Sequence, residues 1–254
     1  MPVWHEATRE LVAQRKINVV GVIQEQHAER ARLYAQWKQF EWPILVDSFN
    51  LLEVQVVPIV LLLDEKGVVR AALRDPERDL EEALQELNAG SERGAPTARP
   101  DDLVAVGVRR IRDLIHFESP PRFDAAIELG DELPNKQTED GRLDFAMGVA
   151  YRARYDADER RRNDFNSAVG HWQRALDADP NQYIWRRRIQ QYGLRMEKPY
   201  PFYDWVSDAQ RTIRGRGQIP VELSARLSAA ELAAEHRACV GVAGFAEIAL
   251  KWGR

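Results

Sequence analysis

The chain has a single cysteine, Cys239, in 254 residues. An internal disulfide and a Cys-x-x-Cys motif both need two cysteines, so neither exists within this sequence. A lone thiol becomes reactive when a base or a positive charge is held beside it. The neighbours of Cys239, "EHRACVGVAGF", form no recognisable motif of that kind. We therefore expect a buried, unreactive thiol.

Other kinds of site lack the residues they would need. The histidines are dispersed, with no His-x-x-x-His pair, which argues against a structural zinc site. No glycine-rich phosphate loop follows a predicted strand, and no Gly-x-Ser-x-Gly sequence occurs. The sequence therefore predicts no metal site, no bound cofactor and no catalytic residue.

Long apolar runs and an excess of positive charge are also missing. No apolar run approaches the ~18 residues of a membrane-spanning helix, and the first residues, "MPVWHEATRELVAQRK", have no apolar signal core. The formal net charge of −4 argues against a general attraction to nucleic acid or anionic lipid. We expect no membrane span and no nucleic-acid partner, and the visible chain carries no signal that gives its localisation.

Residues 1–89 alternate between helical and strand patterns. Continuous apolar stretches such as "INVVGVIQ" predict fully buried strands, and Lys66-Gly67 suits the tight turn of a hairpin. The expected order is a helix at 6–15, a strand at 17–24, a helix at 27–40, a strand at 42–47, two strands within 54–70 and a helix at 79–87. Such alternation predicts an α/β domain with a largely parallel sheet covered on both faces.

The remainder of the chain has a helical pattern. Gly, Ser, Pro and Ala without periodicity predict an interdomain linker at 90–102. Residues 103–197 then resemble tetratricopeptide repeats, with an extra loop, "DADERRRN", that departs from the usual period. The matching positions are Gly148, Tyr151, Ala168, Trp172, Ala175 and Pro180. The resemblance implies an all-α domain that docks a protein partner. The residues after it are expected to form a partly helical tail at 198–254, with a helix at 228–237.

Two further stretches can be interpreted either as ordinary structural elements or as specific binding sites. The arginines of "NQYIWRRRIQQYG" are expected to lie on a solvated helix face, with their aliphatic stems covering apolar surface. The alternative is that they bind a phosphate or an acidic partner. The prolines and aromatics of "KPYPFYDW" are expected to end that helix and pack back on it; a groove that reads polyproline is the alternative.

The stretches "INVVGVIQE", "FEWPILVD" and above all "VQVVPIVLLLDEKGVVR" resemble the thioredoxin superfamily, in particular its TlpA-like and peroxiredoxin-like redoxins. In that family a cis proline begins a strand, and the backbone of the preceding residue pairs with an extended thiol substrate. The matching residues are Pro58 and Val57, which the resemblance implies as substrate-binding residues. A trans proline at the start of an edge strand is the alternative.

The resemblance also implies thiol–disulfide exchange on a protein substrate, by a Cys-x-x-Cys motif that this chain lacks. Met1-Pro2 match the residues just after that motif, and the family's central strand is missing too. One explanation is a fragment or a start at an internal methionine, for example after a selenocysteine codon read as a stop. The others are a noncatalytic adaptor that has lost the motif, and a different α/β fold.

A sheet without its middle strand would expose unpaired backbone groups, which favours truncation over true loss. We therefore expect an oxidoreductase relative that is not competent as written, and an exported protein if an upstream segment exists.

Overall fold

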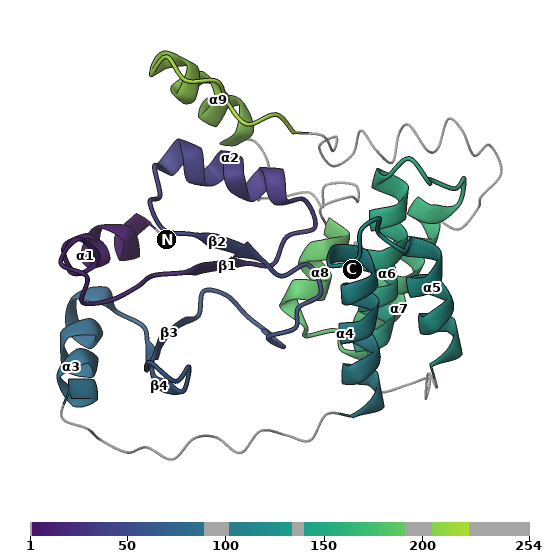
Figure 1. Cartoon of the computed structure of the whole chain (residues 1–254), viewed down its shortest axis with the longest axis horizontal. Helices are drawn as coiled ribbons and strands as arrows, with labels where there is room; N and C mark the ends of the chain where they lie inside the picture. The colour runs from purple at the N-terminus through teal and green to yellow at the C-terminus, as the bar shows by residue number, and fades with distance from the viewer. Residues whose placement is uncertain (1, 89–101, 134–139, 191–204, 224–254) are drawn as a thin grey trace.

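The computed structural model describes residues 2–88, 102–133, 140–190 and 205–223 (Figure 1). The N-terminal region, residues 2–88, contains α1 (Pro2–Ala13), β1 (Gly21–Ile23), α2 (Ala28–Lys38), β2 (Ile44–Val46), β3 (Val60–Leu63), β4 (Val69–Leu73) and α3 (Pro76–Asn88). The helical region, residues 102–190, contains α4 (Leu103–His116), α5 (Phe123–Glu132), α6 (Arg142–Asp156), α7 (Asp164–Ala178) and α8 (Tyr183–Gln190), and α9 (Trp205–Gly215) follows.

The strands of the N-terminal region form two separate pairs. β1 pairs with β2 in parallel, with Val22 opposite Leu45, and β3 pairs with β4 in antiparallel, with Leu61 opposite Ala72. The succession of helices and strands follows the sequence pattern, but the predicted continuous sheet is wrong for the described residues. In Figure 1 the two pairs lie apart, and β1 and β3 are the strands of the two pairs that are drawn nearest to each other.

Each pair is packed against helices on one side. Val60 and Leu62 of β3 contact a small core of Leu73, Leu80 and Ala83, to which α1 adds Trp4 and Leu11. The turn between β3 and β4 forms because Asp64 Oδ1 accepts hydrogen bonds from the backbone of Lys66 and Val68, each 2.9 Å long. Gly67 has a φ of 77°, which favours glycine.

The opposite faces of the strands are uncovered. Apolar side chains of all four strands are exposed, so the expectation of fully buried strands is wrong. These side chains are Val22, Leu45, Val46, Leu61, Leu63 and Val69. A strand is buried on both faces only where a layer of other elements packs on each face, and the exposure of these side chains shows that such a layer is incomplete among the described residues.

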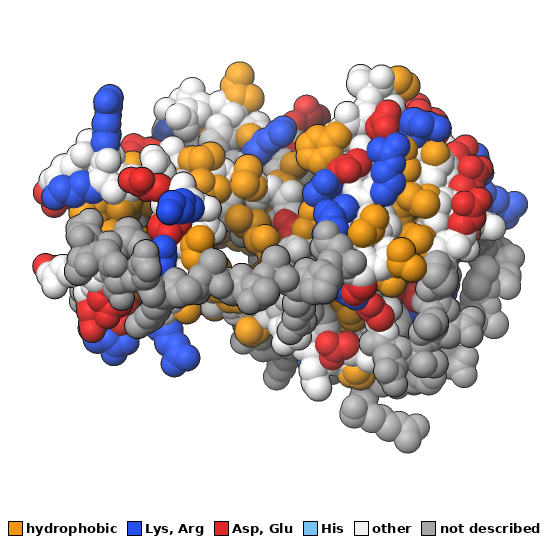
Figure 2. Space-filling view, turned by 60° about the horizontal axis from the view of Figure 1, so that its bottom comes forward, with side chains coloured by type: hydrophobic (Ala, Val, Ile, Leu, Met, Phe, Trp, Pro, Cys, Tyr) orange, Lys and Arg blue, Asp and Glu red, His pale blue; other side chains and the backbone are white. Residues whose placement is uncertain are grey.

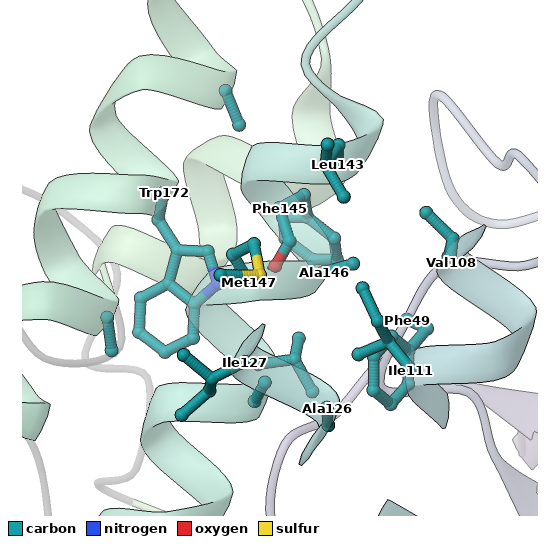
Figure 3. Packing of buried hydrophobic residues seen from close by; sticks show 14 of the residues in the cluster. Phe49, Val108, Ile111, Ala126, Ile127, Leu143, Phe145, Ala146, Met147 and Trp172 are labelled. Carbon is teal, nitrogen blue, oxygen red and sulfur yellow. Dashed lines mark hydrogen bonds between the residues drawn. The ribbon is translucent and has the colours of Figure 1, made fainter. Parts of the chain in front are cut away.

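The helical region holds the largest core of the described residues. Helices adjacent in sequence pack together, and the α6–α7 pair is the closest, because Gly148 of α6 admits the fully buried indole of Trp172. Trp172 Nε1 also donates a hydrogen bond of 3.2 Å to the carbonyl of Phe145, within the cluster drawn in Figure 3. Asp102 is the N-cap of α4, and its carboxylate accepts from the Ala105 amide at 2.6 Å. α4 itself starts at Leu103, the first residue of the predicted helical region, and residues 90–101 of the predicted linker lie outside the described part.

α9 returns to the N-terminal region and packs on α2. Val206, Ala209 and Ile213 bury an apolar face against Leu33 and Trp37. The side chain of Gln36 bonds to the segment after α9: its Nε2 donates to the Ile219 carbonyl at 2.8 Å, and its Oε1 accepts from the Val221 amide at 2.9 Å. Arg216 adds a hydrogen bond of 3.1 Å to the Trp37 carbonyl. The helix predicted at 228–237 and the thiol of Cys239 lie outside the described residues.

Candidate functional site

Val57 and Pro58 lie in an exposed segment that leads directly into β3. Val56, Val57, Pro58 and Ile59 are all exposed, although three of them are large and apolar. The Val57–Pro58 peptide bond is cis, the isomer that the family resemblance implies. The two residues that the sequence predicts as substrate-binding are thus accessible from solvent, at the start of a strand.

The loop before this segment is held in shape by two polar side chains. Asp47 accepts hydrogen bonds from the amides of Leu51 (2.9 Å) and Leu52 (3.3 Å). Asn50 spans the next turn, since its side chain donates to the Val54 carbonyl at 3.1 Å and accepts from the Val54 amide at 3.0 Å. Such local bonds from Asp and Asn replace the backbone partners that a loop lacks.

The same loop is anchored on the helical region. Phe49 is 4 % exposed and belongs to the core of that region, beside Ile111 (Figure 3). The carbonyl of Gln55 accepts from the Tyr183 amide at 3.2 Å, and Glu53 pairs with Arg142 at 3.1 Å. Val57 and Pro58 therefore lie between two fixed parts of the chain. The loop before them is anchored on the helical region, and β3 follows directly after them.

The free side of β3 continues the exposed segment. The Asp64 amide donates to the Val68 carbonyl at 3.0 Å, which directs its peptide group toward β4. Peptide groups alternate along a strand, so those of Leu61 and Leu63 point away from β4. Hydrophobic side chains gather in the middle of the face drawn in Figure 2, between the N-terminal and helical regions. An extended polypeptide that reached Val57 would meet free backbone groups and an apolar surface.

Buried charges lie between the two regions. Arg188 of α8 is 1 % exposed and donates to the Ser48 carbonyl at 3.1 Å. Its guanidinium also lies 5.1 Å from the ring centre of Phe145. The expectation that Arg188 belongs to a solvated face is therefore wrong: its guanidinium is buried and donates a hydrogen bond to the carbonyl of Ser48 in the docked loop. Arg186 and Arg187 are half-buried.

His27 is the titratable group at the centre of this contact. Burial lowers its pKa below the ordinary value of 6.5, and the positive charges of Arg30, Arg152 and Arg188 lower it further. Asp156 lies 3.7 Å from Nδ1, which would favour the charged ring. Its carboxylate is however bound by Arg152, at 2.9 Å, so burial prevails and His27 is neutral.

The described residues supply no obvious reactive group beside Val57 and Pro58. None of them is a cysteine, since Cys239 lies outside them. In the same part of the chain no cluster of three or more His, Cys, Asp or Glu side chains is placed to hold a metal ion. His5 of α1 packs its ring against Phe40 and Trp42 instead of facing the exposed segment. The exposed segment thus presents apolar side chains, and no cysteine of the described residues lies beside it.

Sequence reasoning missed the anchoring residues. Asp47 is the last residue of a predicted strand, and Phe49 and Asn50 follow it, in "VDSFNLLEV". The usable signal was the pair of Asp and Asn residues around one aromatic, which is typical of a structured loop. The burial of Phe49 could not be read from the pattern, because its neighbours belong to helices far along the chain.

No protein-family model, curated protein or solved structure matches this chain. Among the described helices, none is both long enough and apolar enough to cross a membrane.

Proposed function

We propose that this chain binds an extended protein thiol or disulfide substrate at Val57 and Pro58, as a relative of the redoxin-type oxidoreductases. The observation that carries the proposal is the exposed apolar segment at Val56–Ile59, which enters a strand with a free edge. Backbone pairing at such an edge binds a polypeptide with little regard to its sequence. The redox step needs a nucleophile that the N-terminal region does not contain.

In this proposal the helical region docks a protein partner. Its successive helix pairs, α4–α5 and α6–α7, resemble tetratricopeptide hairpins, and the Gly148–Trp172 contact supports that resemblance. A noncatalytic adaptor, in which both regions bind protein, is the second candidate. It is favoured by the absence of any cysteine from residues 1–89.

Binding of fluorescently labelled, thiol-blocked insulin B chain, followed by anisotropy, tests the proposed site. The substitution Val57→Asp places a carboxylate at the open edge, where a charge opposes strand pairing. We expect affinity to fall about tenfold, which corresponds to ~1.4 kcal/mol. The control is Leu103→Asp, another exposed apolar position, at the first turn of α4, for which affinity should not change. Equal affinities for wild type and Val57→Asp would contradict the proposal.

Reduction of insulin disulfides by dithiothreitol tests the redox assignment. We expect no acceleration by the chain itself, and turnover that disappears with Cys239→Ser would show that the lone thiol is catalytic. If this chain is a redoxin relative, an N-terminal extension that supplies a strand and a Cys-x-x-Cys pair before α1 should give it reductase activity. No gain of activity, with peptide binding retained, would favour the adaptor.

A further inference from the structure

Residues 48–55, which we call the docked loop, cross three helices of the helical region. At α4, Ser48 Oγ lies 3.2 Å from His116 Nε2, and the rings of Phe49 and His116 meet edge to face with their centres 5.6 Å apart. Figure 3 shows Phe49 beside Ile111 of the same helix. The aromatic ring therefore fills a site that α4 lines.

The helices α6 and α8 hold the rest of the docked loop through their first residues. Glu53 pairs with Arg142 of α6 at 3.1 Å, and the Gln55 carbonyl accepts from the Tyr183 amide of α8 at 3.2 Å. Phe49, Glu53 and Gln55 thus meet α4, α6 and α8 in that order. The loop lies across these helices as a peptide ligand lies across a receptor.

The docked loop is folded by its own side chains. Asp47 accepts from the amides of Leu51 and Leu52, and Asn50 bonds to both backbone groups of Val54. These bonds do not involve the helical region. A short segment with the same residues can therefore take the same shape on another protein.

One aromatic side chain anchors the docked loop. Phe49 is buried, whereas Leu52 is exposed and the pair of Glu53 with Arg142 is open to solvent. Asp102 also pairs with Arg142, at 2.6 Å, so Glu53 adds little to the stability of the contact. A contact that depends on one anchor residue is typical of a peptide bound to a receptor.

Given the docking role proposed above for the helical region, on which this inference rests, we propose that its partner binds on the face of α4, α6 and α8. The partner carries a loop with the chemistry Asp-x-Phe-Asn-x-x-Glu, and the docked loop competes with it. A loop attached to the same chain has an effective concentration on the order of 1 mM. It therefore excludes weak ligands and is displaced by a partner that binds more tightly.

A fluorescein-labelled peptide of residues 46–55, VDSFNLLEVQ, is the probe, and its binding to the whole chain is followed by anisotropy. Phe49→Leu weakens the docked loop while keeping an apolar side chain in the core and so preserving the fold. This variant should bind the peptide about tenfold more tightly than wild type does. The control Leu52→Ala changes an exposed position of the same loop and should bind as weakly as wild type. Equal affinities for wild type and Phe49→Leu would overturn the proposal.

The binding site of the peptide is tested in the Phe49→Leu chain. A peptide with alanine in place of its phenylalanine should bind at least tenfold more weakly. On the helical side, adding His116→Ala should weaken binding of the original peptide about fivefold, whereas Phe117→Ala, at an exposed neighbour, should leave it unchanged. Peptide binding that ignores His116→Ala would place docking on another surface, which overturns this inference and leaves the docking role standing.

Light scattering distinguishes a partner loop from a second copy of the chain. The Phe49→Leu chain should keep the mass of wild type at the concentrations used for anisotropy. A dimer that gains no affinity for the peptide would overturn the proposal in favour of a second copy. Insulin B-chain binding that stays sensitive to Val57→Asp, with no peptide binding by any variant, would overturn this inference alone and leave the proposed substrate site standing.

Discussion

The position of single side chains determines how closely α6 and α7 approach. A Cβ atom at Gly148 would overlap the indole ring of Trp172, which has no room to retreat because it is fully buried. Gly170, on the facing helix, is different, since a Cβ there would come no closer than 3.8 Å to Arg174. Two glycines of the same helix pair therefore have opposite roles.

Replacing each glycine by alanine separates these roles. Gly148→Ala should lower the free energy of unfolding by about 1–3 kcal/mol through overpacking. Gly170→Ala should raise it by up to about 1 kcal/mol, because alanine favours the helix. Urea denaturation measures both, and a Gly148→Ala variant as stable as wild type would show that α6 and α7 are not in the described contact.

The neutral His27 makes stability depend on pH. Its folded-state pKa is lowered, so below pH 6.5 the unfolded chain binds a proton that the folded chain does not. The free energy of unfolding should therefore fall as the pH drops from 6.5 to 5, by up to about 1.4 kcal/mol per pH unit for this group. His116, whose pKa is also lowered by burial and then by Arg112, adds in the same direction.

The substitution His27→Gln removes the titrating ring. We expect a flatter dependence of unfolding free energy on pH between 6.5 and 5 than in wild type, measured by urea denaturation at several pH values. An unchanged slope would mean that folding does not lower the pKa of His27.

At the scale of the element, the pattern of apolar residues predicted where strands occur. It did not predict which other elements pack on the faces of those strands. The run "INVVGVIQ" predicted a buried strand, and β1 does form within it. Burial depends on which neighbours are present, and a local pattern carries no information about them. The exposure of Val22 and Leu61 is therefore a property of strand pairing, which only the structure shows.

Two other elements illustrate the same limit. α9 was not predicted, although Val206, Ala209 and Ile213 have helical spacing. The interpretation of this part of the chain rested on the aromatic stretch before it, which was expected to end a helix. Gly148 and Trp172 were both singled out by the sequence, because they match a known repeat pattern, and the structure places them in contact within one helix pair. Contacts between neighbouring elements are readable from sequence, whereas Arg188 and Ser48, which are 140 residues apart, are not.

At the scale of the whole molecule, the N-terminal and helical regions share a core through Phe49. Removing its ring with Phe49→Ala should lower the free energy of unfolding by about 3–5 kcal/mol. The matched control is Leu52→Ala in the same loop, which is 63 % exposed and should change stability by less than about 0.5 kcal/mol. Similar values for the two variants, measured by urea denaturation, would show that the loop is not anchored in the helical core.

The return of α9 to α2 has a consequence for biosynthesis. Gln36 meets Ile219 across 183 residues, which a ribosome adds in roughly 10–40 s. Throughout that interval Leu33 and Trp37 of the nascent chain are without the helix that covers them in the finished protein. The apolar face of α2 thus stays without its cover for most of the synthesis of the chain.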